Sequence, residues 1–125
     1  MPKIDNTHTE SFTNIPGIRF TPVASPSRGS SETAVWRYVL LPGTDGRAHH
    51  VTREEIIVAT KGEGIVTIGE DAHALRPGDA FAVPAFVDFK VDCAGETPFE
   101  ALVVLPAGGR AVVAGQPAFQ PPWSV

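Results

Sequence analysis

Short runs of apolar residues alternate with polar turns along most of this chain. The runs are rich in β-branched and aromatic residues, and none shows the 3.6-residue period of an amphipathic helix. Glycine and proline cluster between them, as expected for tight turns. We predict strands at 18–23, 33–41, 55–60, 65–68, 72–75, 80–83, 86–91, 99–105 and 111–113. Many short strands separated by turns predict an all-β sandwich or barrel.

The pattern also divides the chain into three parts. Residues 1–32 are polar and form an N-terminal arm with one short strand. The strand-rich segment 33–113 forms the barrel. Residues 114–125 form a C-terminal tail, whose prolines exclude a central strand because they lack the amide hydrogen of the ladder. We expect the tail to pack over an open edge or end of the barrel, anchored by Phe119 and Trp123.

Composition narrows the class of protein. Apolar residues make up 42% of the chain and charged residues 19%, which is typical of a globular domain. The net charge is −4, and the sequence has no cluster of lysine and arginine residues of the kind that binds nucleic-acid phosphates. No apolar run approaches the ~20 residues of a membrane span, and Cys93 has no cysteine partner. We expect a cytoplasmic protein that binds neither nucleic acid nor membrane.

The spacing of glycine, histidine and glutamate is the most informative motif. Gly43, His49, Val51, Glu55 and Gly62 follow the pattern G-x5-H-x-V-x3-E-x6-G without a gap. This resembles the first motif of the cupin superfamily, G-x5-H-x-H-x3,4-E-x6-G. Val51 stands where the family has its second histidine.

A second segment resembles the other cupin motif, G-x5-P-x-G-x2-H-x3-N. Pro84 takes the proline position, while Phe86, Phe89 and Cys93 replace the glycine, histidine and asparagine. The resemblance covers roughly residues 33–106. It implies an all-β double-stranded β-helix, which is a jelly-roll barrel.

The same resemblance implies a metal site of three histidines and one glutamate. Here His49 and Glu55 remain, while Val51 and Phe89 are apolar. A one-residue slip brings in His50 as the alternative ligand but still leaves two ligands out of four. Catalytic metal sites normally have three protein ligands. We therefore predict no tightly bound metal, with a weakly bound divalent ion as the remaining possibility.

The inner face of the predicted barrel is expected to be mostly apolar. A polar corner at His49 and Glu55 is either a hydrogen-bonded acid/base pair or a structural pair, and Phe89 either lines a cavity or fills it. Either Arg37 or Trp36 and Tyr38 face the interior. The candidate pocket residues share this inward face: Val51, Ile57, Ala59, Phe81, Val83 and Phe89.

Three functions fit these residues. The first is binding of a small, largely apolar molecule without a tightly bound metal. The second is a metal-independent isomerase, cyclase or lyase in which His49 and Glu55 move protons. The third is a metal-dependent oxygenase-type cupin with an unusual ligand set. Whether the chain is an enzyme stays open. We also expect a homodimer that covers the edge strand near the N-terminal arm and buries Trp36.

Overall fold

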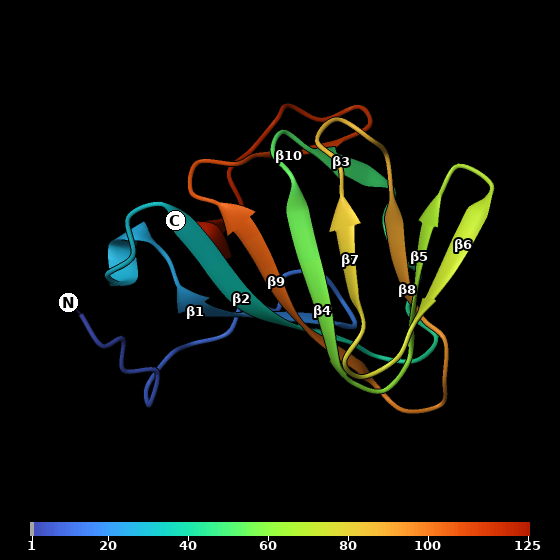
Figure 1. The fold of residues 1–125 in the computed structure, drawn as a ribbon, viewed down its shortest axis with the longest axis horizontal. Coiled ribbons are helices and arrows are strands. Elements are labelled where there is room, and N and C mark those ends of the chain that lie inside the picture. Colours follow the sequence, from blue (N-terminus) through green and yellow to red (C-terminus); the bar gives the residue numbers. More distant parts are fainter. Residues whose placement is uncertain (1) are drawn as a thin grey trace.

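Strands form nearly all the regular structure of the computed structural model, which describes residues 2–125 (Figure 1). Within that range there are ten strands and two short 3-10 helices. The strands are β1 (Ile18–Ala24), β2 (Thr33–Leu40), β3 (His49–Val51), β4 (Glu55–Lys61), β5 (Gly64–Ile68), β6 (Asp71–Leu75), β7 (Ala80–Val83), β8 (Lys90–Cys93), β9 (Phe99–Pro106) and β10 (Ala111–Val113). The helices are η1 (Pro26–Arg28) and η2 (Pro122–Ser124). Neither is long or apolar enough to span a membrane. The predicted all-β class is confirmed.

Three antiparallel sheets build the barrel. The largest has five strands in the order β1-β2-β9-β4-β7, the second has the order β6-β5-β8, and β10 pairs with β3 alone. The chain passes repeatedly from one large sheet to the other, as in the predicted jelly roll. The two larger sheets converge at the lower end in Figure 1 and splay apart toward the end where β3 and β10 lie.

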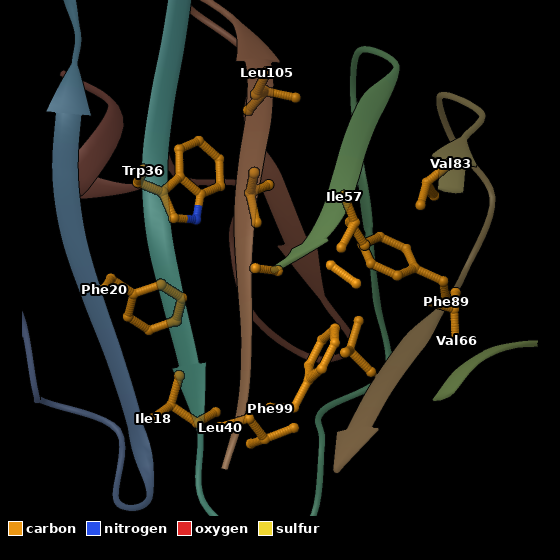
Figure 2. Close-up of a cluster of buried hydrophobic side chains, with 14 of the residues drawn as sticks. Ile18, Phe20, Trp36, Leu40, Ile57, Val66, Val83, Phe89, Phe99 and Leu105 are labelled. Atoms are coloured by element: carbon orange, nitrogen blue, oxygen red, sulfur yellow. The ribbon is translucent and has the colours of Figure 1, made fainter. Parts of the chain in front are cut away.

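Buried and more exposed residues alternate along the strands, and the buried ones form the hydrophobic core. Along β9 the buried residues alternate with half-buried ones, as expected for a strand with one face on the core. The inward set is Phe99, Ala101, Val103 and Leu105. Phe99 is fully buried and lies beside Leu40, its partner on β2, as Figure 2 shows. Burying a side chain of this size contributes about 1.5–3 kcal/mol.

The last glycine of the first motif has a steric role. Gly62, in the turn between β4 and β5, has a φ angle of +71°, which L-residues rarely adopt. A Cβ atom there would also collide with the carbonyl oxygen of Pro98. The turn therefore needs glycine both for its backbone angle and for its close approach to the chain before β9.

The strand predicted at 86–91 is wrong at its start, because β8 begins only at Lys90. Phe86 has a φ angle of +64°, outside the extended region, and this breaks the strand despite its apolar alternation. Phe89 makes a single β-bridge, to His49. The short strand β3 containing His49 was absent from the predicted series.

Both chain ends pack on the first strand of the sheet. Phe12 in the N-terminal segment pairs with Phe20 of β1 through two backbone hydrogen bonds of 2.7 and 3.0 Å. The indole of Trp123, in η2, stacks on the Phe20 ring with centroids 3.7 Å apart and planes 6° from parallel. Trp123 is 6% exposed and belongs to the hydrophobic core. The end of the tail, at Pro121, Trp123 and Ser124, is therefore part of the packed interior, while residues 114–119 are exposed.

Candidate functional site

A cavity of about 320 Å³ is lined by inward-facing residues of the barrel strands and by residues of both terminal segments. The five-stranded sheet contributes lining residues from β1, β2, β4 and β9, and β3, β8 and β10 contribute the others. The C-terminal tail also borders the cavity. Its lining includes Phe20, Trp36, Tyr38, His49, Val51, Glu55, Ile57, Phe89, Val103, Phe119 and Trp123. Phe89 therefore lines the cavity and does not fill it.

Strand β2 resolves the question of which side chains face inward. Trp36 and Tyr38 line the cavity, and Trp36 is only 4% exposed. Arg37, between them, is exposed on the opposite face of the strand. Figure 2 shows the Trp36 and Phe20 rings projecting from neighbouring strands to the same side of the sheet. Sequence alternation paired Trp36 with Tyr38 but did not identify the buried face.

Three of the six predicted pocket residues line the cavity: Val51, Ile57 and Phe89. Ala59 and Val83 are buried in the core but lie away from the cavity lining. Phe81 is half-buried, and its ring centroid lies 5.1 Å from that of His73 on β6. The inward face of β7 is thus directed toward the three-stranded sheet.

Sequence reasoning missed much of the aromatic wall. Phe20 was not proposed as a pocket residue, and Phe119 and Trp123 were expected only as anchors of the tail. Trp36 and Tyr38 were one of two alternatives for the interior face of their strand. Apolar alternation around 18–23 and 33–41 placed some of them on strands. Their convergence with the tail depends on long-range packing that the sequence pattern does not contain.

His49 is held in one tautomer by the backbone. Its Nδ1 atom lies 2.8 Å from the carbonyl oxygen of Arg47. A carbonyl oxygen only accepts, so Nδ1 donates its hydrogen, and Nε2 of the neutral ring keeps its lone pair. Burial lowers the pKa of His49, and the hydrogen bond to Arg47 opposes the shift only in part. The imidazole is a neutral base at neutral pH.

Glu55 is a buried acid at the start of β4. It is 6% exposed, and its carboxyl group makes no hydrogen bond or ion pair with any residue in the range 2–125. Burial raises the pKa of Glu55 to about 8, because the apolar surroundings penalise the carboxylate. At neutral pH the side chain is mainly a protonated carboxyl that can donate a hydrogen bond.

Tyr38 adds a second neutral donor. Burial raises the pKa of its hydroxyl well above the usual value. At the alkaline pH where a phenol titrates, Glu55 and Asp92 are ionised, and their negative charges raise that pKa further. The phenol stays protonated throughout the physiological range. The cavity therefore combines an apolar lining with two protonated oxygen acids and one neutral imidazole.

His49 and Glu55 share the cavity without a direct bond. Neither a hydrogen bond nor an ion pair joins them in the described part of the chain. The coupled pair considered from the sequence is therefore absent from the geometry. A molecule inside the cavity would meet a base and an acid as separate groups.

The donor set does not fit the tightly bound metal of a four-ligand site. Val51 and Phe89, at the positions of the two missing histidines, are 2% exposed and apolar. No group of three or more His, Cys, Asp or Glu residues in the range 2–125 is arranged to hold a metal ion. His50, the alternative ligand, lies outside the cavity lining, and its Nδ1 is 3.0 Å from Oδ1 of Asp88.

Residues 36–105 match the protein-family model that is described as the Cupin domain. Among curated proteins, auxin-binding protein T85 of Nicotiana tabacum is 34% identical over 64 residues. That stretch covers 50% of this chain and 34% of the relative, so the match spans about a third of the relative's length.

Several solved structures share the fold. The polyketide cyclase RemF of Streptomyces resistomycificus has a TM-score of 0.78 at 14% identity, covering 94% of this chain and 87% of its own. A sugar phosphate isomerase of the cupin superfamily from Silicibacter pomeroyi has a TM-score of 0.74 at 21% identity, covering 92% and 83%. An RmlC-like cupin from Shewanella frigidimarina has a TM-score of 0.68 at 20% identity, covering 79% and 84%.

Proposed function

The chain belongs to the cupin family, and from that premise we propose that it binds a small, largely apolar molecule in the barrel without a tightly bound metal. Cupins carry many unrelated activities, so the family alone does not select a function. The cavity carries the proposal. Its volume of about 320 Å³ lies at the lower end of the range for small-molecule sites.

The lining favours a flat ligand. Aromatic residues from three separate parts of the chain border the cavity, and aromatic faces pack well against planar rings. Glu55 and Tyr38 supply hydrogen-bond donors, and Nε2 of His49 supplies an acceptor. An apolar ring carrying one or two oxygen substituents matches this combination. The curated relative named as an auxin-binding protein supports small-molecule binding as the general class.

Calorimetric titration with 2-naphthol tests this proposal, with two matched variants. Val103 lines the cavity, whereas Val104 beside it on β9 faces the outside of the sheet. Val103→Phe fills part of the cavity and should weaken binding at least tenfold, whereas Val104→Phe should leave it within twofold. Equal affinities for both variants and the wild type would contradict binding in the cavity.

His49 can accept a proton at neutral pH and Glu55 can donate one, and this favours a second function, that of a metal-independent isomerase, cyclase or lyase. A neutral imidazole and a protonated carboxyl facing one cavity are the two partners that proton transfer needs. His49 Nε2 would take a proton from a substrate carbon, and Glu55 would donate its proton to a substrate oxygen. A structural neighbour named as a polyketide cyclase and another named as a sugar phosphate isomerase share this fold.

The two functions separate by experiment. Hydrogen exchange at acidic carbon positions of bound cyclic ketones, followed by NMR, reports proton transfer directly. Loss of exchange in both His49→Ala and Glu55→Gln selects the enzyme. Ligand binding that survives both changes, with no exchange in the wild type, selects the binding protein.

We also propose a homodimer, although the burial of Trp36 no longer argues for it. Trp36 is buried within the single chain, so a partner subunit is not needed to cover it. The half-buried apolar residues on the outer face of the five-stranded sheet offer another surface: Val35, Ile56, Val58, Leu102 and Val104. Light scattering tests the dimer, and a monomer across the micromolar range would contradict it.

A further inference from the structure

The mouth of the cavity is defined by the lining residues that are exposed. They are Asn14, Arg47, Gln116 and Phe119, from the N-terminal segment, the segment before β3 and the tail. Among residues 2–125, Arg47 is the only charged residue at this mouth and the only basic residue with a permanent charge in the cavity lining.

The Arg47 guanidinium has no ionic partner. Neither an ion pair nor a hydrogen bond from this group is present in residues 2–125. Two acidic groups of the same region are engaged elsewhere, and the exposed Asp45 forms no ion pair with Arg47. Asp88 pairs with His50, while Asp92 pairs with Lys90 at 3.4 Å and accepts a hydrogen bond from the Gly46 amide at 2.9 Å.

The backbone of Arg47 is anchored at the same time. Its carbonyl oxygen accepts the hydrogen bond from His49 Nδ1, which fixes this residue beside the cavity wall. The side chain is thus attached to an ordered point at the mouth and has free donors. The side-chain amides of Asn14 and Gln116 lie on the same rim and offer further neutral donors.

Resting on the proposed function, we propose that the ligand is an amphiphilic organic anion with a single carboxylate held at the mouth by Arg47. The apolar body enters first and lies among the aromatic side chains. The planar guanidinium matches a carboxylate through paired hydrogen bonds. The opposite orientation would bury the charged carboxylate among apolar side chains, away from the guanidinium, and burying a charge without an opposite charge beside it is costly.

A matched pair of probes isolates this contact. Naphthalene-2-carboxylate and naphthalene-2-carboxamide have nearly the same shape, but only the first is charged. Calorimetric titrations of both into wild type, Arg47→Gln and Arg37→Gln supply the comparison. Arg37 is an exposed arginine on the outer face of β2, so its substitution makes the same change in net charge away from the cavity.

Arg47→Gln should weaken carboxylate binding about tenfold, the usual size of a lost charge-assisted hydrogen bond, and leave carboxamide binding within twofold. Arg37→Gln should change neither affinity by more than twofold. Unchanged carboxylate binding in Arg47→Gln, or equal weakening of both probes, would overturn the proposed anion site while leaving cavity binding intact. Absence of binding by both probes to the wild type would count against the proposed function itself.

Discussion

Nδ1 of His49 lies 2.8 Å from the carbonyl oxygen of Arg47, so the residue at the cavity mouth sets the tautomer of the imidazole. The contact joins a histidine in the cavity wall to Arg47, which in the described part of the chain is the only permanently charged residue at the cavity mouth. It leaves Nε2 as the nitrogen with the free lone pair. The first motif of the sequence therefore retains a chemically defined base even though its second histidine is a valine.

The His49 ring should titrate below the ordinary histidine range. Burial lowers its pKa, so the stability contributed by the neutral ring is present above about pH 6.5 and is lost as the pH falls through the lower folded value. Nitrogen-15 NMR of the ring checks both the pKa and the tautomer. A midpoint at or above 6.5, or a proton on Nε2 in the neutral form, would contradict this account.

Glu55 should give the opposite dependence of stability on pH. Its pKa is about 8 in the folded protein and near 4.5 when unfolded, so its contribution is complete below pH 4.5 and is lost as the pH rises through 8. One proton corresponds to at most about 1.4 kcal/mol of unfolding free energy per pH unit. Urea unfolding between pH 5 and 9 should show this slope in the wild type and a flatter profile in Glu55→Gln.

Glu54→Gln is the matched control for that series. Glu54 is the exposed neighbour of Glu55 in sequence, and its substitution should leave the slope unchanged. Identical pH profiles for the wild type and Glu55→Gln would show that the buried carboxyl is not protonated in the folded state.

Metal content provides a separate prediction. With Val51 and Phe89 in place of two ligands, purified untagged protein should hold well under one transition-metal ion per chain. Elemental analysis by plasma mass spectrometry measures this directly. Near-stoichiometric iron, zinc, nickel or manganese that disappears in His49→Ala would contradict this prediction and support the third function, a metal-dependent oxygenase-type cupin.

Phe86 should be a source of backbone strain. It is 69% exposed and has a φ angle of +64°, where a side chain costs roughly 1–2 kcal/mol relative to glycine. Phe86→Gly should therefore raise the unfolding free energy by about 1 kcal/mol, after the extra entropy of glycine in the unfolded chain is subtracted. Phe86→Ala removes the ring but keeps the strain, so chemical denaturation should show no comparable gain.

The sequence predicted the architecture better than the site, for physical reasons. Period-two alternation and turn residues report on local backbone, so β2, β4 and β9 were placed within one or two residues. The positive φ of Phe86 has no signal in an apolar run, and the strand there was misplaced. The motif identified His49 and Glu55 as cavity residues, but their separate roles depend on burial and on the Arg47 carbonyl.

The cavity walls were less predictable still. Trp123 lies far from Phe20 in sequence, and their stacking results from how the tail crosses the barrel end. The same holds for Arg47, whose place at the mouth follows from the path of the chain before β3. Contacts between distant segments of this kind are fixed by the packed fold and not by the local pattern.

Trp36 and Trp123 allow the most direct test of small-molecule binding in the barrel. They are the only two tryptophans of the chain, and both line the cavity. In nitrogen-15 correlation spectra of labelled protein titrated with 2-naphthol, both indole N–H signals should shift and saturate together at one ligand per chain. Indole signals that stay in place while naphthol binds elsewhere, or shifts that never saturate, would contradict a ligand site inside this barrel.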